Sequence, residues 1–266
     1  MKPSLRKQYV GKEFSVLDHG FVQLVDVMGD DGAIVSAART SVHNVKTSRD
    51  TRGLINYLMR NMHTSPFEMV EFKFLCKMPI FVARQWVRHR TASINEQSAR
   101  YGVMDDEFYM PEQWRVQSKN NKQGSSEEVV DQFYTGRIQT RAQEIRKEAY
   151  DHYQNQLNIG VAREEARIDL PLSLYTKWVW KIDLLNLFRF LKLRMDSHAQ
   201  YEIRVYANAM AEIVRAFVPI AWDAFEEHWL YAKTLSRSDY DALKKFAVTG
   251  SLPAEAMRIL GMPLAT

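Results

Sequence analysis

Several features on which large classes of protein depend are missing from this sequence of 266 residues. It contains one cysteine, Cys76, which excludes an intrachain disulfide and any cysteine-rich zinc site. None of its seven histidines forms a His-x-x-x-His pair, so we expect no metal site. Gly-x-Gly-x-x-Gly and Gly-x-x-x-x-Gly-Lys-[Ser/Thr] are both absent. The sequence therefore gives no support for a doubly wound dinucleotide-binding domain or for P-loop chemistry.

Long apolar runs are also missing. No run approaches the ~18 residues that a membrane span requires, and the basic residues Lys2, Arg6 and Lys7 are not followed by the apolar segment of a signal peptide. We therefore expect a cytoplasmic protein that does not associate with membranes. The net charge of +4 suits either anionic small molecules or nucleic acid as partners, because the excess of base is mild and scattered.

The composition is sufficient for a folded core, since 46% of the residues are hydrophobic. No linker, internal repeat or low-complexity tract divides the chain. We predict one α+β domain over residues 1–266, with a small mixed sheet and long helices, and with 222–266 as a helical C-terminal extension. Alternating or β-branched apolar residues predict strands, at 20–28, 68–77 and 172–181. Helical spacing predicts helices, at 31–42, 49–62, 78–87, 129–158, 161–168 and 183–217.

Residues Arg88 to Tyr101 form an unusually polar stretch, Arg-His-Arg-Thr-Ala-Ser-Ile-Asn-Glu-Gln-Ser-Ala-Arg-Tyr, behind the apolar predicted helix 78–87. Arginine offers a fixed fork of donors that matches phosphate, and serine hydroxyls and loop amides complement it. Composition alone leaves two interpretations open, an anion-binding loop and a solvated basic surface turn.

Two further segments carry polar residues in positions that suit a site. In His63-Thr-Ser-Pro-Phe-Glu68, Ser65 and Glu68 have the spacing of a capping box, and such a turn exposes backbone amides; it is equally typical of an ordinary helix start. Arg194 falls on an apolar helical face with Phe190 and Leu191, where an arginine either reaches solvent or points into a site.

These segments together resemble the flavin-dependent thymidylate synthases. Arg88-His89-Arg90, seven residues and then Ser98 resemble the family signature. The turn from His63 to Glu68, the segments Ala166-Arg167-x-x-Leu-Pro171 and Leu193-Arg194-x-Asp-x-His-Ala-Gln200, and Ala38-Arg39 resemble its other motifs in the same order. The matches extend roughly from Gly20 to Ala221, and the sequence is identified as a member of this family.

The resemblance implies a reductive methylation of dUMP to dTMP. Methylenetetrahydrofolate would supply the carbon, and FAD reduced by NADPH would supply the hydride. It also implies a homotetramer whose active sites are shared between subunits. No thiol nucleophile is required, so Cys76, on the apolar face of a predicted strand, is expected to be a core residue.

Residue by residue, the resemblance implies two overlapping sets of contacts. The positions that match dUMP-binding residues are Gln85, Arg88, Glu96, Gln97, Ser98, Arg100, Arg167 and Arg194. The positions that match FAD-binding residues are Ser65, Arg88, His89, Arg90, Glu96, Asp183 and Arg189. Arg194 matches the residue that polarises the uracil and is the expected catalytic group. His63 matches a histidine near the flavin and the folate.

The sequence departs from the family pattern between Asp183 and Arg189, where members use Asn, His or Arg side chains toward FAD. Leu185 offers no hydrogen bond, and Arg189 replaces an Asn or His. A nucleic-acid-binding protein is the first alternative, but the basic residues form no stripe. A flavin protein of this fold that has lost methylation is the second alternative.

Overall fold

The computed structural model describes residues 3–40, 50–119 and 121–249. The last two residues of the predicted helix 31–42, the first residue of the predicted helix 49–62 and the end of the predicted extension 222–266 lie outside this described part. The chain divides into two compact units, Met1–Phe225 and Glu226–Thr266. The second unit contains a π-helical turn at Glu226–Leu230 and the helix α10 at Arg237–Thr249.

The first unit is built on a five-stranded sheet in the order β1-β2-β3-β7-β4. Its strands are β1 Glu13–Val16, β2 Gly20–Met28, β3 Glu71–Pro79, β7 Tyr175–Asp183 and β4 Ser93–Glu96. Every neighbouring pair is antiparallel, so the predicted mixed sheet is wrong. The spacing of apolar residues identifies a strand but does not fix the direction of the strand beside it, so the sequence pattern did not determine how the strands pair.

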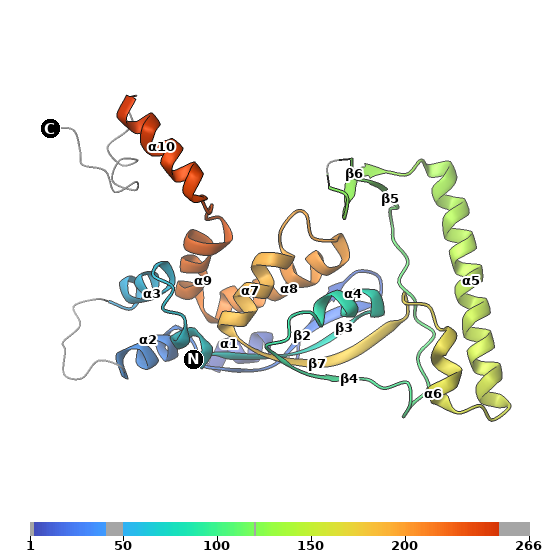
Figure 1. Cartoon of the computed structure of the whole chain (residues 1–266). Helices are drawn as coiled ribbons and strands as arrows, with labels where there is room; N and C mark the ends of the chain where they lie inside the picture. The colour runs from blue at the N-terminus through green and yellow to red at the C-terminus, as the bar shows by residue number, and fades with distance from the viewer. Residues whose placement is uncertain (1–2, 41–49, 120, 250–266) are drawn as a thin grey trace. The chain divides into compact units, whose positions relative to one another are not determined.

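One face of the sheet forms the core. The alternation predicted for β3 is confirmed, because Phe72, Phe74 and Cys76 are fully buried. On β7 the residues Trp178 and Trp180 are buried in the same way. Figure 1 shows α4, α7 and α8 over one side of the strands, and these helices contact the sheet or one another. Burial of large aromatic side chains between helices and sheet is the main source of stability here.

The first unit also contains helices α1 Pro3–Tyr9, α2 Asp31–Thr40, α3 Thr51–Arg60, α4 Ile80–Trp86, α5 Gln132–Asn158, α6 Arg163–Ala166, α7 Leu184–Arg194, α8 Tyr201–Phe217 and α9 Pro219–Phe225. Two 3-10 turns, η1 at Ser65–Met69 and η2 at Arg167–Asp169, complete it. The predicted capping box at Ser65 is wrong: the segment is a 3-10 turn whose N-cap is Thr64, and no side chain caps it.

Helix α8 lies close to the sheet, and this closeness depends on a glycine. The Tyr206 hydroxyl donates to the Lys77 carbonyl oxygen at 2.7 Å. A Cβ on Gly20, in the neighbouring strand β2, would lie 2.0 Å from that hydroxyl. Only a residue without a side chain therefore permits this helix–sheet approach.

The predicted helix 183–217 is two helices. Its start is confirmed, since the Asp183 side chain accepts a hydrogen bond from Asn186 N at 3.0 Å. The chain leaves the helix after Arg194 and re-enters it at Tyr201. In the break, the Asp196 carboxylate accepts from the His198 backbone amide at 2.8 Å, a local bond that competes with helix formation.

Two segments predicted as polar loops contain strands. β4 pairs with the edge of β7 inside the stretch Arg88–Tyr101. The segment 117–128, expected to be an irregular loop, lies in a hairpin of β5 Arg115–Gln117 and β6 Ser125–Val129. Both escape detection because most of their side chains are polar and because none of these strands has a buried face; even the one apolar residue of β4, Ile94, is exposed. Alternation between apolar and polar residues arises only where one face is buried.

The long helix α5 is confirmed as unbroken through Gly136, and Gly160 adopts a φ of 91° just after its end. It joins the rest of the first unit through a second, smaller core. There the Tyr150 hydroxyl donates to the Met104 carbonyl oxygen at 2.8 Å. Met104 N in turn donates to the Tyr153 hydroxyl at 3.2 Å, and Leu174 completes the buried group.

Candidate active site

The first group of predicted site residues is brought together where α4 ends and α7 ends. We call Gln85, His89, Phe190 and Arg194 the Arg194 cluster. Arg194 Nε donates to His89 Nε2 at 3.0 Å, and Arg194 Nη2 donates to the Gln85 carbonyl oxygen at 3.2 Å. The His89 ring meets the buried Phe190 ring edge to face, with 4.9 Å between centroids. The hydrogen bonds from Nε and Nη2 thus fix the orientation of the guanidinium without any ligand.

Burial sets the protonation of this cluster. It lowers the pKa of His89 to about 4, with the positive charge of Arg194 acting in the same direction. His89 is therefore neutral at pH 7, and Nε2 accepts while Nδ1 carries the proton. Burial also lowers the pKa of Arg194, although a guanidinium remains charged at neutral pH. The cluster consequently presents one positive charge rather than two.

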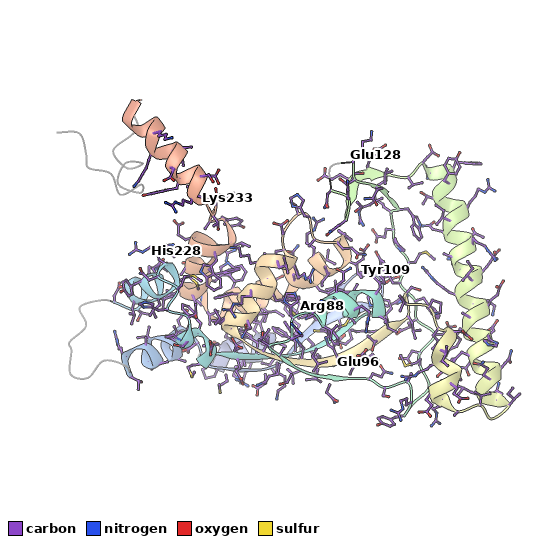
Figure 2. All side chains as sticks on the ribbon, viewed as in Figure 1. Arg88, Glu96, Tyr109, Glu128, His228 and Lys233 are labelled. Carbon is purple, nitrogen blue, oxygen red and sulfur yellow. The ribbon has the colours of Figure 1, made fainter. Side chains whose placement is uncertain are left out.

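Arg88 and Arg90 follow α4 on either side of His89, and both are exposed. Their guanidinium groups make no hydrogen bond or ion pair with the described residues. Figure 2 labels Arg88 at the end of α4 and Glu96 along β4. An unpaired guanidinium at the surface keeps all of its donors available for an anion.

The second group of predicted residues lines a cavity of about 360 Å³ beside β4, which we call the β4 cavity. Its polar lining consists of Glu96, Gln97, Ser98, Arg167 and Thr176. Glu96 accepts a hydrogen bond from the buried Thr176 hydroxyl at 2.8 Å. Gln97 N donates to the Lys177 carbonyl oxygen at 2.8 Å and so holds the end of β4 against β7.

The remaining lining of the β4 cavity is apolar. It is made by Ile80, Ala99, Met104, Leu170 and Leu174, several of which belong to the small core beneath α5. A space lined by both charged and apolar side chains fits a ligand that carries both an anion and an uncharged ring.

The two arginines predicted near this cavity differ in their surroundings. Arg167 lines the cavity, and its Nε makes one long hydrogen bond of 3.4 Å to the Glu164 carbonyl oxygen. Arg100 does not line it; its Nε lies 3.1 Å from the Glu164 carboxylate, in an exposed ion pair. Such an exposed pair contributes only about 0–1 kcal/mol, so Arg100 can leave it at small cost.

The third group combines the turn η1 with the start of α7. Leu184 N donates to the Val70 carbonyl oxygen at 2.8 Å, which places the end of η1 beside Asp183. Asp183 uses both carboxylate oxygens on Asn186, and Arg189 Nη1 donates to Asn186 Oδ1 at 2.9 Å. Asp183 is therefore a helix cap in this structure. Its assignment to FAD remains a prediction.

Three other residues of this region are also placed. Ser65 and His63 are exposed, and the His63 ring meets Tyr57 edge to face at 5.7 Å. Leu185, which replaces a polar residue of the family pattern, is only 2% exposed and belongs to the core. The side chain at this position therefore packs in the core and makes no hydrogen bond.

A larger cavity, of about 520 Å³, contains none of the predicted residues. Its lining includes Tyr109, Arg115, Gln200 and Glu202. Glu202 is only 6% exposed and accepts from the Tyr109 hydroxyl at 3.1 Å. The predicted site did not include these residues, although Gln200 ends one of the matched motifs. Glu202 also carried a signal, because it falls beside Ile203 on the apolar stripe of α8. A carboxylate among core positions is seldom placed there without partners.

Among the described residues no group of three or more His, Cys, Asp or Glu side chains is arranged to hold a metal ion. Within the same residues, every helix is too short or too polar to cross a bilayer.

The comparison with known proteins identifies the family of the chain. Residues 23–220 match the family model described as thymidylate synthase complementing protein. A flavin-dependent thymidylate synthase of Thermus thermophilus is 54% identical over 248 residues, which cover 93% of this chain and 90% of the relative. The enzyme of the same name from Wolbachia pipientis wMel is 51% identical, with 88% and 83% covered.

A solved structure is also similar. It is a UMP/dUMP methylase, PolB, from Streptomyces cacaoi bound with 5-Br dUMP, and it superimposes with a TM-score of 0.72 at 35% identity. The match covers 80% of this chain and 97% of that one. The fold and these similarities show that the protein is an enzyme. The chain belongs to the family of flavin-dependent thymidylate synthases.

Proposed function

We propose that this chain converts dUMP to dTMP by reductive methylation, with methylenetetrahydrofolate as the carbon donor and NADPH as the reductant. The observation that carries the proposal is the Arg194 cluster, in which a half-buried guanidinium is held by His89 and Gln85. Nη1 has no partner among the described residues, so the guanidinium can face a ring on which negative charge develops. A fixed cation in a partly desolvated site stabilises such charge better than a mobile one.

The neutral state of His89 contributes to this role. Because burial and Arg194 hold its pKa near 4, the imidazole accepts a hydrogen bond from Arg194 without competing for the negative charge on the substrate. This hydrogen bond also restricts the rotation of the Arg194 side chain. We assign Arg194 as the residue that polarises the uracil and His89 as the residue that orients it.

The nucleotide phosphate is assigned to the basic residues around β4. Arg167 and Ser98 line the β4 cavity, Arg88 is exposed and unpaired among the described residues, and Arg100 is held only by a surface ion pair. Forked guanidinium donors and a hydroxyl suit a phosphate dianion. Glu96, Gln97 and Gln85 supply acceptors and amide groups for the sugar and the base.

FAD fits the exposed polar groups that remain. Arg88 and Arg90 offer guanidinium donors for a pyrophosphate, and His89 separates them. Ser65 at the start of η1, together with Asp183 and Arg189 on the adjacent α7, would hold other parts of the cofactor, and Glu96 would contact it from β4. His63 would lie near the flavin and the folate. When bound, FAD supplies the hydride that completes the methyl group.

The proposed route needs no enzyme thiol, and the state of Cys76 supports this. Its side chain is fully buried in the centre of β3, and burial raises the pKa of the thiol well above its ordinary value. A thiolate is the nucleophilic form of cysteine, and a buried thiol in apolar surroundings does not ionise near neutral pH. Cys76 is the only cysteine of the chain.

We further propose that the enzyme works in the cytoplasm as a homotetramer with shared active sites. Several residues assigned to the site, among them Ser65, Arg88 and Arg90, are exposed on the single chain and so are accessible to a second copy. A chain with one cysteine does not depend on the disulfides that are typical of secreted proteins, which fits a cytoplasmic enzyme.

The test is a direct assay of the purified protein. Incubation with dUMP, methylenetetrahydrofolate and NADPH should yield dTMP, and the protein should show the visible absorption of a bound flavin. Omission of dUMP or of the folate should abolish the product. A flavin-loaded protein that makes no dTMP under these conditions would contradict the proposal and favour a flavin protein without methylation activity.

A further inference from the structure

A chain of side-chain hydrogen bonds runs from the Arg194 cluster to a buried carboxylate. Gln85 Nε2 donates to Gln200 Oε1, and Gln200 Nε2 donates to Glu202 Oε2 at 2.8 Å. The other carboxylate oxygen, Glu202 Oε1, accepts from the Tyr109 hydroxyl at 3.1 Å and from Arg115 Nη1 at 3.4 Å. We call Gln85, Gln200 and Glu202 the amide relay.

The order of donors and acceptors in the amide relay follows from the carboxylate. An ionised carboxylate only accepts hydrogen bonds, and the arginine and the phenol that face Glu202 are donors. Gln200 must therefore direct its NH₂ group toward Glu202, which leaves its carbonyl oxygen for Gln85. Gln85 must then use its own NH₂ group on Gln200. Its Oε1 atom is left without a partner among the described residues.

The position of Gln85 is fixed at two points by this arrangement. Its main-chain carbonyl oxygen accepts from Arg194 Nη2 at 3.2 Å, and its side-chain nitrogen is held by Gln200. A glutamine amide is otherwise free to rotate by half a turn, which exchanges acceptor for donor. The amide relay removes that freedom, because reversal would place two NH₂ groups or two oxygens against each other.

We propose that Glu202 is a positioning residue for the nucleotide: through Gln200 it orients the side-chain amide of Gln85 so that an acceptor, Oε1, faces a donor group of the substrate. The inference rests on the proposed function, in which Gln85 contacts dUMP. dUMP has two such donors, the N3–H of the uracil ring and the 3′-hydroxyl of the sugar. A pyrimidine ring with an acceptor at position 3, as in cytosine, would meet Oε1 with the wrong polarity.

Glu202→Gln tests the inference, because a neutral amide can donate as well as accept and no longer dictates the order of the relay. We expect the KM for dUMP to rise roughly 3- to 10-fold, the worth of about one neutral hydrogen bond, with kcat and flavin content nearly unchanged. Gln85→Ala should raise the KM to a similar degree. The double variant should be no worse than Gln85→Ala alone, since Glu202 acts through Gln85.

Controls separate positioning from a general loss of stability. Glu148→Gln makes the same chemical change at an exposed position on α5 and should leave the KM for dUMP within twofold. Gln200→Leu interrupts the relay without altering the buried charge, so it should reproduce the KM effect even if Glu202→Gln fails to fold. Two effects that multiply in the double variant, or a normal KM in Gln200→Leu, would overturn the inference.

Two nucleotide analogues identify the donor. Wild-type protein should prefer dUMP over N3-methyl-dUMP if the ring N3–H faces Gln85, or over 2′,3′-dideoxy-UMP if the 3′-hydroxyl does. The relevant preference should shrink in Glu202→Gln, and persistence of both preferences would overturn the acceptor role. Calorimetric titration with dUMP reads the same interactions without turnover. A wild-type protein that makes no dTMP therefore refutes the proposed function, whereas equal dUMP affinity in all relay variants refutes the relay.

Discussion

The two regions assigned to the same nucleotide are built in opposite ways. In the Arg194 cluster, the guanidinium is half-buried and held by hydrogen bonds to His89 and Gln85. Around the β4 cavity, Arg167 makes one long bond and Arg100 rests in an exposed ion pair. The difference fits the tasks proposed for them: charge that develops on a ring is stabilised by a cation fixed in advance, whereas a phosphate that arrives charged can organise mobile arginines itself.

The largest expected effect comes from a substitution in the Arg194 cluster. Arg194→Ala removes the guanidinium, and dTMP formation should fall about 10²–10³-fold in kcat, as for the loss of one preorganised donor. Bound flavin should remain, because Arg194 is not among the residues assigned to FAD. The measurement is turnover together with the visible spectrum. Lys192→Ala, at an exposed position of α7, is the matched control, and near-normal turnover by Arg194→Ala would remove the distinction between the two regions.

Substitutions around the β4 cavity should weaken the binding of dUMP rather than slow turnover. Arg167→Ala deletes a charged donor of the β4 cavity, and the KM for dUMP should rise about 10- to 100-fold, since a hydrogen bond to a charged group contributes roughly 1.5–3 kcal/mol. kcat at saturating dUMP should change little. Arg163→Ala, an exposed arginine on α6, should leave the KM unchanged. Calorimetry that shows equal dUMP affinity in Arg167→Ala would contradict this role.

A smaller effect is expected from acid. The pKa of His89 lies near 4 in the folded protein and near 6.5 when exposed, so unfolded chains bind a proton between these values and folded chains do not. The contribution of His89 to the free energy of unfolding is therefore fully present above pH 6.5 and decreases as the pH drops toward 4. His89→Gln keeps an acceptor but cannot titrate. Its Tm should fall less than that of the wild type between pH 7 and 5, by on the order of 2 °C, because the half-exposed ring is partly screened by water.

Equal acid sensitivity of wild type and His89→Gln would show that His89 is not held neutral by its surroundings. The Arg194 cluster would then be less fixed than its hydrogen bonds indicate.

The smallest expected effect is that of Cys76→Ala, which lies in the core and belongs to neither region. Loss of the sulfur should cost roughly 1 kcal/mol of stability, similar to one buried methylene, and should leave dTMP formation within about twofold. Thermal unfolding and turnover measured on the same preparation provide both values. A folded, flavin-loaded variant without activity would disprove the thiol-free route.

Much of the fold could be predicted because burial leaves a periodic trace in the sequence. The patterns place strand β2 and helix α5 nearly to the residue, and they identify Asp183 as the cap of α7. The same logic fails where neither face is buried. β4 is exposed at every position, so its polar residues are typical of a loop, and only its pairing with β7 reveals the strand.

The candidate site was predictable as a set of residues but not as a geometry. Motif positions identified Arg194 and Gln85, yet nothing in the sequence showed that they touch or that His89 accepts from Arg194. Thr176 and Glu202 were missed because their importance comes from contacts with Glu96 and Gln200, respectively, and those contacts form only in the folded chain. A local sequence pattern carries no record of them.

Strand β7 has a consequence for how this sequence can change. At one end Thr176 holds Glu96 beside the β4 cavity, and at the other Asp183 starts α7, which ends in Arg194. A single inserted residue within β7 would turn the later side chains of this strand to the opposite face of the sheet. The same insertion would change the spacing between the β4 cavity and the Arg194 cluster. Length variation in this protein should therefore be confined to places such as the β5–β6 hairpin, and β7 should be inherited as a strand of constant length.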